Sequence, residues 1–396
     1  MPKHSESSKE KHVASAGGEI LETVRALAVE IGPRPSASPA EERAAEFVAE
    51  RLKEAGFRVR LETFRGLTTF SLPYGIIYAL FIAAALLYLL SPAACVVLSS
   101  LGLLFHLSES NARPLLSRIL PKRASRNVIG VRPAQREARR RLVISAHLDS
   151  SKAALFFHPN LLYDLRFFSI LMVAAMFLIF FLAVIGLFIS LGWFWYLQLA
   201  GAGLLGLGLI MLIHRELLMP HTPGANDNAS GVALMLKAAR TLPRLRFTEL
   251  WMVGTGCEES NLWGMLAFLD SNNLDKETTF FINLDHLGAG QVAYITAEGM
   301  FWPYHADLEL VRLAVETASE EGLDAQGRAF HTLTTDALAP LARGYRGMSI
   351  MAFDERGLLP NWHWLSDTAE NVSASTLENA WRLLSGIVRK IDSEVV

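Results

Sequence analysis

Residues 248–284 read TELWMVGTGCEESNLWGMLAFLDSNNLDKETTFFINL, and their pattern decides the fold class. The apolar run at 248–254 predicts a strand, 259–269 has helical spacing, and 279–284 is a second, mostly apolar strand. A helical pattern at 230–239 precedes them, so helices and strands alternate along this part of the chain. That alternation predicts an α/β fold with a doubly wound mixed sheet flanked by helices.

Hydrophilic segments elsewhere extend the same domain, because none of them alone has enough strands for a sheet. Ser38 and Pro39 suit the cap and first turn of a helix that runs to Gly56. Alternation at 57–63 is typical of a half-buried strand. Short apolar runs that predict buried strands lie at 127–131, 142–146 and 348–353, and helical patterns lie at 20–28, 308–321 and 376–391.

Two long uncharged stretches interrupt this domain. The chain is 51% hydrophobic and 19% charged, yet 43 consecutive residues between Arg65 and Glu109 and 48 between Arg166 and Arg215 contain no Asp, Glu, Lys or Arg. A bilayer core needs roughly 20 helical residues per span, so each stretch predicts a transmembrane hairpin. Of the four spans, the segment 93–107 is the shortest. This composition excludes a purely soluble enzyme, a disordered chain and a disulfide-stapled module.

The predicted organisation follows from these boundaries. A disordered tail occupies 1–17, the hydrophilic domain consists of 18–71, 108–166 and 215–396, and the hairpins occupy 72–107 and 167–214. Twelve Lys and Arg residues lie within about 20 residues of the span ends on one side, and the two hairpin turns have none. We therefore expect a multi-pass integral membrane protein whose hydrophilic domain faces the cytoplasm.

Charge and cysteine content limit the binding partners and the cellular compartment that we expect for this chain. A net charge of −2 gives no general attraction to nucleic acid. The basic run Arg132, Arg136 and Arg139 to Arg141 is expected to be solvated or to face lipid rather than to form a binding site. Two cysteines, Cys95 and Cys257, are too few for a disulfide framework, which fits a reducing compartment.

Candidate site residues follow strand-like runs or stand in loops, where an α/β sheet presents metal ligands and the groups that support them. They are His147 and Asp149 in LVISAHLDS (142–150), Asp227 in PGANDNASG (223–231), Glu258 and Glu259 after the strand at 248–254, Asp285 in FFINLDHLG (280–288), and His363 in NWHWLSDTAEN (361–371).

The adjacent pair Glu258 and Glu259 is the most specific of these signals. Two neighbouring carboxylates repel each other unless they share a cation or a proton. Structural explanations remain for each position: Asp227 could cap the next helix, the Glu pair could begin one, and His363 could be a surface residue. Together, the nitrogen and oxygen donors suit zinc.

The order and spacing of these motifs resemble the co-catalytic di-zinc aminopeptidase family, which includes bacterial leucyl aminopeptidase, aminopeptidase S and aminopeptidase Y. The resemblance covers about 20–391 and is densest in HLD, PGANDNASGVA, the Glu pair, NLD and the late His with DT. The segment IGPRPSASPAEERAAEFVAERLKEAGF (31–57) is similar to the family's N-terminal helix. The chain thus resembles a membrane-embedded variant of this family.

This resemblance implies two Zn²⁺ ions. His147 and Asp285 would bind one ion, Glu259 and His363 the other, and Asp227 would bridge both. Glu258 matches the family's general base, and Asp149 matches the carboxylate that orients His147. The implied activity is removal of N-terminal residues from peptides with a free N-terminus, through a water activated between two metals.

The hairpins place the expected site near lipid, because Asp149 and Arg166 are only 17 residues apart. Hydrophobic or membrane-derived peptides are therefore the expected substrates, with the bilayer as a second partner. Two other functions stay open: a glutaminyl-cyclase-like zinc acyltransferase on the same fold, and a non-catalytic membrane scaffold. A transporter is disfavoured because the spans contain no charged residue. Side-chain specificity and oligomeric state have no sequence signal.

Overall fold

The computed structural model describes residues 18–189 and 191–393. The chain forms two compact units. Unit 1 consists of Met1–Thr68, Lys122–Ser151 and His221–Val396, and unit 2 of Thr69–Pro121 and Lys152–Pro220. The tail predicted at 1–17 lies outside the described residues.

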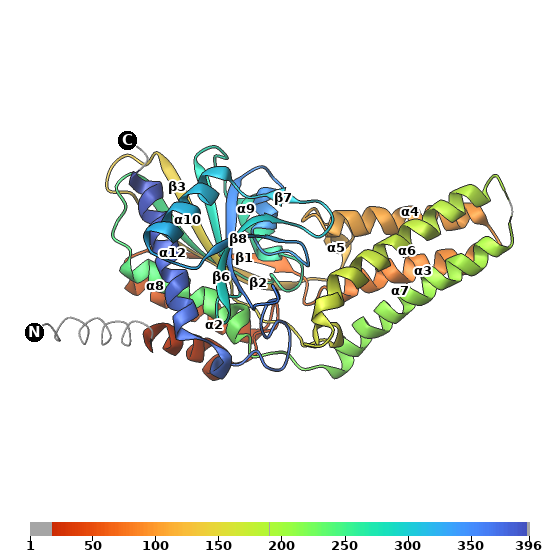
Figure 1. Ribbon diagram of the computed structural model, residues 1–396, viewed down its shortest axis with the longest axis horizontal. Helices are drawn as coiled ribbons and strands as arrows, with labels where there is room; N and C mark the ends of the chain where they lie inside the picture. Colours follow the sequence, from red (N-terminus) through yellow and green to blue (C-terminus); the bar gives the residue numbers. More distant parts are fainter. Residues whose placement is uncertain (1–17, 190, 394–396) are drawn as a thin grey trace, which may run out of the picture. The chain divides into compact units, whose positions relative to one another are not determined.

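Within the described residues, nine strands of unit 1 form one mixed sheet (Figure 1). The strands are β1 (Arg58–Gly66), β2 (Arg123–Arg132), β3 (Arg140–His147), β4 (Thr248–Thr255), β5 (Thr279–Leu284), β6 (Gln291–Glu298), β7 (Tyr304–His305), β8 (Gln326–Phe330) and β9 (Arg346–Phe353). Their order is β1-β2-β4-β3-β5-β9-β6-β7, with β8 paired to β6. The central strands β4, β3, β5 and β9 are parallel, so their carboxyl ends meet at one edge.

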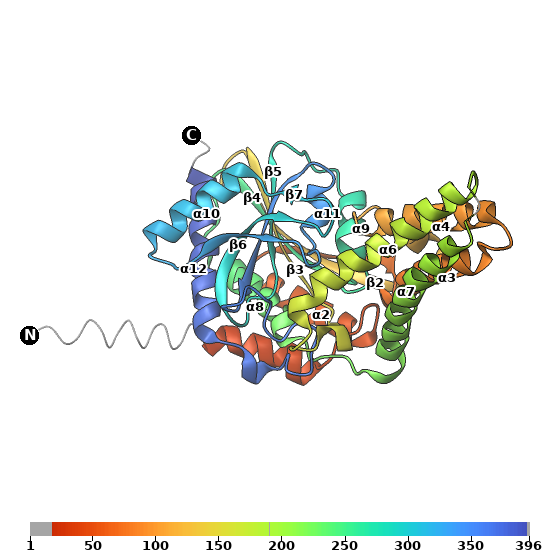
Figure 2. The same ribbon diagram turned by 45° about the vertical axis from the view of Figure 1, so that its right-hand side comes forward.

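Helices cover this sheet on two faces (Figures 1 and 2). The helices of unit 1 are α2 (Pro39–Glu54), α8 (Ser230–Thr241), α9 (Trp263–Ser271), α10 (Leu308–Glu320), α11 (Leu338–Leu341) and α12 (Ala374–Ser393), and 18–25 is also helical. The predicted cap is confirmed, since the Ser38 hydroxyl accepts a hydrogen bond from the Glu41 amide. The expected mixed sheet flanked by helices is confirmed.

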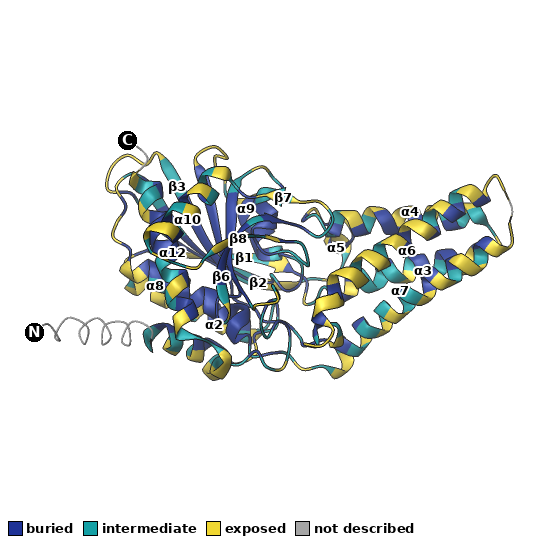
Figure 3. Cartoon of the chain, in the orientation of Figure 1, coloured by how far each residue is buried: buried dark blue, intermediate teal, exposed yellow. Residues whose placement is uncertain are grey.

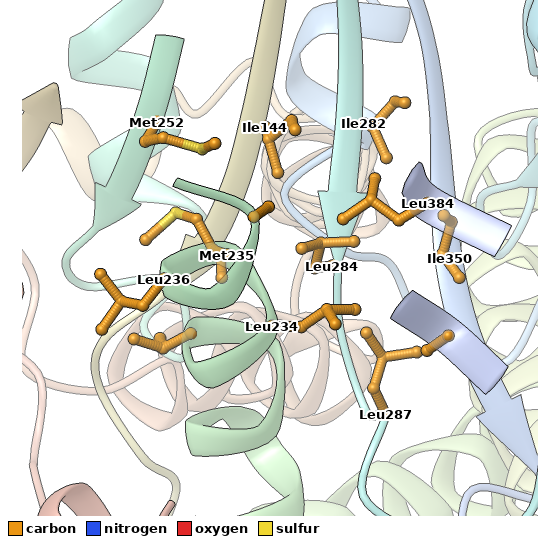
Figure 4. Close-up of a cluster of buried hydrophobic side chains, with 14 of the residues drawn as sticks. Ile144, Leu234, Met235, Leu236, Met252, Ile282, Leu284, Leu287, Ile350 and Leu384 are labelled. Carbon is orange, nitrogen blue, oxygen red and sulfur yellow. The ribbon is translucent and has the colours of Figure 1, made fainter. Parts of the chain in front are cut away.

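The largest core lies between the sheet and the helices α2, α8, α10 and α12. Ile144, Ile282 and Ile350 project from β3, β5 and β9 toward Met235 of α8 and Leu384 of α12 (Figure 4). The opposite face packs against α9, where the Phe268 ring lies 6.4 Å from that of Phe281. Because apolar side chains cover both faces, β5 is buried along its whole length.

Two parts of unit 1 differ from expectation. Strands β6, β7 and β8 were not predicted; β6 contains a short apolar run at 292–295 that sequence reasoning overlooked, and β7 has only two residues. The helix expected at 259–269 begins only at Trp263, because Cys257, Asn261 and Leu262 adopt positive φ angles of 54°, 96° and 60°. These residues form a turn that separates Glu258 and Glu259 from the helix.

Unit 2 is helical in its described residues and consists of α3 (Ser71–Leu87), α4 (Pro92–Glu109), α5 (Leu116–Ile119), α6 (Leu165–Gly186) and α7 (Trp193–Leu218), with short turns at 155–157 and 162–164. Helix α3 packs on α4 and α7, and α6 packs on the same two helices. Small residues permit close approach: a Cβ on Gly102 would overlap the Phe81 ring.

The outer surface of these helices is apolar. In Figure 3 they alternate between buried and exposed positions, and the exposed positions include Phe181, Leu207 and Ile210. Three helical segments, Pro92–Glu109, Leu162–Gly186 and Trp193–Leu218, are long and apolar enough to cross a membrane by length and composition. Helix α3 has 17 residues and falls just short, whereas the segment expected to be shortest extends to Glu109 in α4.

Candidate metal centre

The predicted ligands meet at the carboxyl edge of the parallel strands. His147 ends β3, Glu258 and Glu259 follow β4, and Asp285 follows β5. Asp227 lies in the irregular segment η4 (Ala225–Ala229) before α8, and His363 lies in the loop after β9. Their donor atoms form three groups, each within 4.8 Å: His147, Asp227 and Asp285; Asp227, Glu259 and His363; and His147, Glu258 and Glu259.

Asp227 lies between two histidines and turns one oxygen toward each. His147 Nε2 is 3.0 Å from Asp227 Oδ1 and 3.7 Å from Asp285 Oδ1. His363 Nε2 is 2.9 Å from Asp227 Oδ2 and 3.0 Å from Glu259 Oε2. Each histidine Nε2 thus faces two carboxylates, and a single imidazole N–H cannot donate well to both. A cation between them would be attracted to the imidazole nitrogen and to both carboxylates. This arrangement matches two adjacent nitrogen and oxygen donor sets.

The donors suit zinc in their burial as well as their chemistry. His147, Asp227, Glu259, Asp285 and His363 are all at most 8% exposed. Glu259 Oε1 is buried and accepts no hydrogen bond from the residues that the structure describes. A buried carboxylate oxygen without a partner is costly unless it meets a cation or water. Histidine and carboxylate are ordinary zinc ligands, so these residues fit that metal.

The structural explanations for single residues do not hold. Helix α8 begins without a side-chain cap, so Asp227 does not cap it. Helix α9 begins four residues after Glu259, so the Glu pair does not start a helix. His363 is 6% exposed and is therefore not a surface residue.

The surroundings of Glu258 are those expected of a proton acceptor. Its Oε2 lies 4.0 Å from His147 Nε2. Burial raises the pKa of Glu258 well above its usual value; Glu259, Asp336 and Asp285 act in the same direction, and His147 opposes them. Burial also raises the pKa of Glu259, against the effect of His363. A buried carboxyl group with a raised pKa accepts a proton more readily than an exposed one.

Asp149 supports the turn that carries the Glu pair. Its Oδ1 accepts from the Glu258 amide at 3.1 Å, and its Oδ2 accepts from the Glu259 amide at 3.1 Å and from Ser36 Oγ at 2.6 Å. His147 Nδ1 is 3.1 Å from the Asp149 carbonyl oxygen and 3.6 Å from its carboxylate. In this geometry the backbone of Asp149 holds the imidazole, and its carboxylate holds the Glu pair.

Sequence reasoning missed two further supports of the site. Glu41 of α2 accepts from the Cys257 amide at 2.7 Å and from Ser125 Oγ at 2.6 Å, which ties α2 to the same turn. Asp367, four residues after His363, accepts from the amides of Asn226 at 2.6 Å and Asp227 at 3.3 Å. Glu41 lies within the family-like segment 31–57 and Asp367 within the DT motif, and neither was assigned a role from the sequence.

Arg34 is a buried cation behind the ligands, and it too was missed. Its guanidinium donates to the carbonyls of Leu148, Leu27, Gly32, Pro223 and Gly224 at 2.7–3.1 Å. Burial lowers the pKa of Arg34 to about 10, while Asp367, Asp149 and Asp227 act against that decrease. Arg34 therefore stays charged near neutral pH and joins the segments next to His147 and before Asp227.

The basic run has a structural role. Arg132 donates to the carbonyls of Ala239 and Leu242 at the end of α8, and Arg140 and Arg141 pair with Glu309 and Glu249. Arg136 and Arg139 of the same run are exposed.

Comparison with known proteins gives a family match over one part of the chain. Residues 213–388 match the sequence model of Peptidase family M28. This match covers less than half of the chain, and it includes Asp227, Glu258, Glu259, Asp285 and His363. No curated protein sequence matches the chain significantly.

Solved structures share the fold of this chain. The zinc aminopeptidase BSAP from Bacillus subtilis is 15% identical with a TM-score of 0.57, and the match covers 94% of each chain. An aminopeptidase from Aneurinibacillus sp. strain AM-1 is 15% identical with a TM-score of 0.57, over 94% of this chain and 93% of that one. Tannerella forsythia glutaminyl cyclase is 17% identical with a TM-score of 0.54, over 95% and 98%.

At these identities the structures establish the fold, and the family match establishes the enzyme class. The resemblance to zinc aminopeptidases is thereby confirmed, and the chain is a zinc-dependent hydrolase of the peptidase type.

Proposed function

We propose that this chain is a membrane-anchored di-zinc aminopeptidase that removes N-terminal residues from peptides. His147 and Asp285 would hold one Zn²⁺ ion, Glu259 and His363 would hold the second, and Asp227 would be shared by both sites. The observation that carries the proposal is Asp227, which faces a histidine with each of its oxygens, at 3.0 Å and 2.9 Å.

The chain's own residues divide the reaction between them. Bound zinc supplies a Lewis acid that polarises the scissile carbonyl and acidifies water. Glu258 takes a proton from the water as its oxygen bonds to the carbonyl carbon, and returns that proton to the amine as the C–N bond breaks. Asp149 keeps Glu258 in place through the backbone amides of the Glu pair.

A substrate panel on the detergent-solubilised full chain tests this proposal. We expect release of free N-terminal amino acids from unblocked peptides, no cleavage of N-acetylated ones, and two zinc ions per chain. Glu258→Gln should lower kcat by roughly 10²–10⁴-fold, since it removes the general base, while zinc content stays at two. Glu355→Gln, at an exposed position, is the matched control. Equal cleavage of blocked peptides, or full activity in E258Q, would contradict the assignment.

A glutaminyl-cyclase-like acyltransferase is the second candidate, because a solved cyclase shares the fold. The two activities differ in product: an aminopeptidase releases glutamine from a Gln-initiated peptide, whereas a cyclase leaves a pyroglutamyl end on the same peptide. Mass spectrometry of the product separates them. The two donor sets around Asp227 favour hydrolysis.

The membrane part of the proposal rests on unit 2 and on chain connectivity. The chain leaves unit 1 at Ser151 and returns at His221, four residues after His147 and six before Asp227. We propose that α3, α4, α6 and α7 form two transmembrane hairpins, and that the substrates are hydrophobic or membrane-derived peptides. In liposomes, kcat/KM should be higher for a peptide that carries an acyl chain on a C-terminal lysine and keeps a free N-terminus than for the same peptide without the acyl chain. Equal values would remove this substrate class.

A further inference from the structure

His286 directly follows the proposed ligand Asp285 and is the feature of the site that no motif explains. Its side chain is 2% exposed, and its backbone has a φ of 50°, which is uncommon for a residue other than glycine. Its carbonyl accepts from the Ala352 amide at 3.0 Å, which anchors it to β9. The packing therefore holds an unfavourable backbone conformation at the end of β5.

Both ring nitrogens of His286 face carboxylates of the proposed metal centre. Nδ1 lies 3.3 Å from Asp285 Oδ1, and Nε2 lies 3.6 Å from Asp227 Oδ2. The ring meets Trp362 edge-on, with centroids 5.9 Å apart and planes at 90°. A buried imidazole fixed in this way cannot turn away from the two carboxylates.

We propose that His286 is a positioning residue of the metal centre, which donates from Nδ1 to Asp285 Oδ1 and so holds that carboxylate beside His147. This inference rests on the proposed function. Carboxylates that ligate a metal are commonly held by hydrogen bonds from residues behind them. The Nδ1 separation is that of a hydrogen bond, and His286 belongs to none of the three donor groups within 4.8 Å.

Four substitutions distinguish the effect of the Nδ1 hydrogen bond from the effects of the imidazole ring and of the backbone conformation. His286→Asn keeps a donor near the Nδ1 position, and asparagine tolerates positive φ. His286→Gln places its amide near Nε2 instead. His286→Gly relaxes the backbone but has no donor, and His286→Leu removes both nitrogens. His305→Asn, at an exposed histidine of β7, is the matched control.

The readouts are the zinc dissociation constant, from competition with a chelating indicator, and the visible spectrum of the Co²⁺-substituted full chain. Metal-free melting temperatures check that each variant folds. We expect H286L, H286G and H286Q to weaken zinc binding by roughly 10- to 100-fold, and H286N to stay within a few-fold of the parent chain. The Co²⁺ spectrum of H286N should match that of the parent, because the ligands are unchanged.

Other results overturn the inference in identifiable ways. If H286G binds zinc as tightly as H286N, the backbone alone is responsible. If H286N loses zinc as H286L does, or changes the Co²⁺ spectrum, the Nδ1 hydrogen bond is not the role of His286. If the parent chain binds no zinc, the proposed function itself fails. If the parent and every His286 variant bind zinc equally well, the proposed function stands and only the role of His286 is overturned.

Discussion

Arg34 shows how a single residue can hold the candidate site without touching a proposed ligand. Five backbone carbonyls accept from its guanidinium, and they come from three separate segments of unit 1. Its positive charge also lies among Asp367, Asp149 and Asp227, which carry negative charge when ionised. Lysine has the charge but not the planar fork of donors, so the two residues are not equivalent here.

Arg34→Lys should therefore lower both the melting temperature and the zinc affinity. Buried carbonyls that lose their donor cost about 1–3 kcal/mol each, so the loss should be easily measured by thermal unfolding in detergent. Arg43→Lys, at an exposed position of α2, should leave both quantities unchanged. Equal melting temperatures for R34K and R43K would show that the five hydrogen bonds are dispensable.

Glu298 is a second single residue whose surroundings make the stability of the fold depend on pH. Its Oε2 accepts from the Thr335 amide at 3.1 Å and hydroxyl at 2.9 Å, and the side chain is buried. Burial raises the pKa of Glu298 from 4.5 to about 8, with Thr335 acting in the opposite direction. Between pH 4.5 and 8 the folded chain keeps a proton that the unfolded chain loses, so stability falls as pH rises through this window.

Glu298→Gln lacks this proton and should not lose stability with pH in the same way. The stability of the parent relative to E298Q should fall by at most about 1.4 kcal/mol per pH unit between pH 5 and 8. Melting temperatures measured across this range provide the test, with Glu355→Gln as the exposed control. Parallel curves for the parent and E298Q would contradict the raised pKa.

At the scale of elements, the loop before α8 leaves no space for a side chain at Gly224. Gly224 has a φ of 64°, and a Cβ there would lie against Ser150 Cβ, 2.6 Å from the Asp227 carbonyl oxygen and 2.8 Å from Arg34 Nη2. Gly322 has a similar φ of 59° but nothing within 4 Å of its Cβ position. Replacing either glycine with alanine would therefore carry a similar free-energy cost for the left-handed backbone. The two positions differ in the space available for the added Cβ.

Gly224→Ala should therefore lower zinc affinity and melting temperature more than Gly322→Ala. Both substitutions carry roughly 1–2 kcal/mol for a left-handed alanine, and only G224A must also displace the chain next to Asp227. Zinc titration and thermal unfolding of the two variants measure the difference. If both variants lose the same stability and bind zinc equally, the loop has room that the structure does not show.

Elements set by local pattern could be predicted from the sequence, and elements set by packing could not. Strand β5 is a short apolar run, and α2 has its Ser-Pro start, so both were found. The start of α9 was misplaced because three non-glycine residues with positive φ precede it. Their conformation depends on hydrogen bonds from the Glu258 and Glu259 amides to Asp149, more than 100 positions away along the chain.

The same distinction applies to the site. The strand order brings the carboxyl ends of β3, β4 and β5 together, so ligands predicted from strand ends could be expected to converge. Arg34 and His286 had no such signal. The contact of Arg34 with Leu148 spans 114 positions, and the position of the His286 ring depends on Trp362. The identity of the ligands themselves stays a prediction for metal analysis.

For the whole molecule, the two units alternate along the chain instead of following one another. Ser151 and Thr222 are joined by a backbone hydrogen bond of 2.8 Å where the chain leaves and re-enters unit 1. Arg34 and Ser150 also contact this junction, since Ser150 Oγ donates to the Thr222 carbonyl at 2.9 Å and accepts from the Arg34 amide at 3.0 Å. The two ends of the inserted segment that contains α6 and α7 are thus joined by hydrogen bonds, close in the chain to the proposed ligands His147 and Asp227.

The proposed membrane topology predicts which positions can be labelled from outside the cell. Gly192 lies in the turn between α6 and α7, and Glu355 lies on the surface of unit 1. Because the basic residues flank the other span ends, Gly192→Cys should react with a membrane-impermeant maleimide in intact cells, and Glu355→Cys should react only after lysis. Cys95 and Cys257 are buried and should give little background. Labelling of E355C in intact cells would place unit 1 outside, and labelling of neither before lysis would place the turn on the cytoplasmic side.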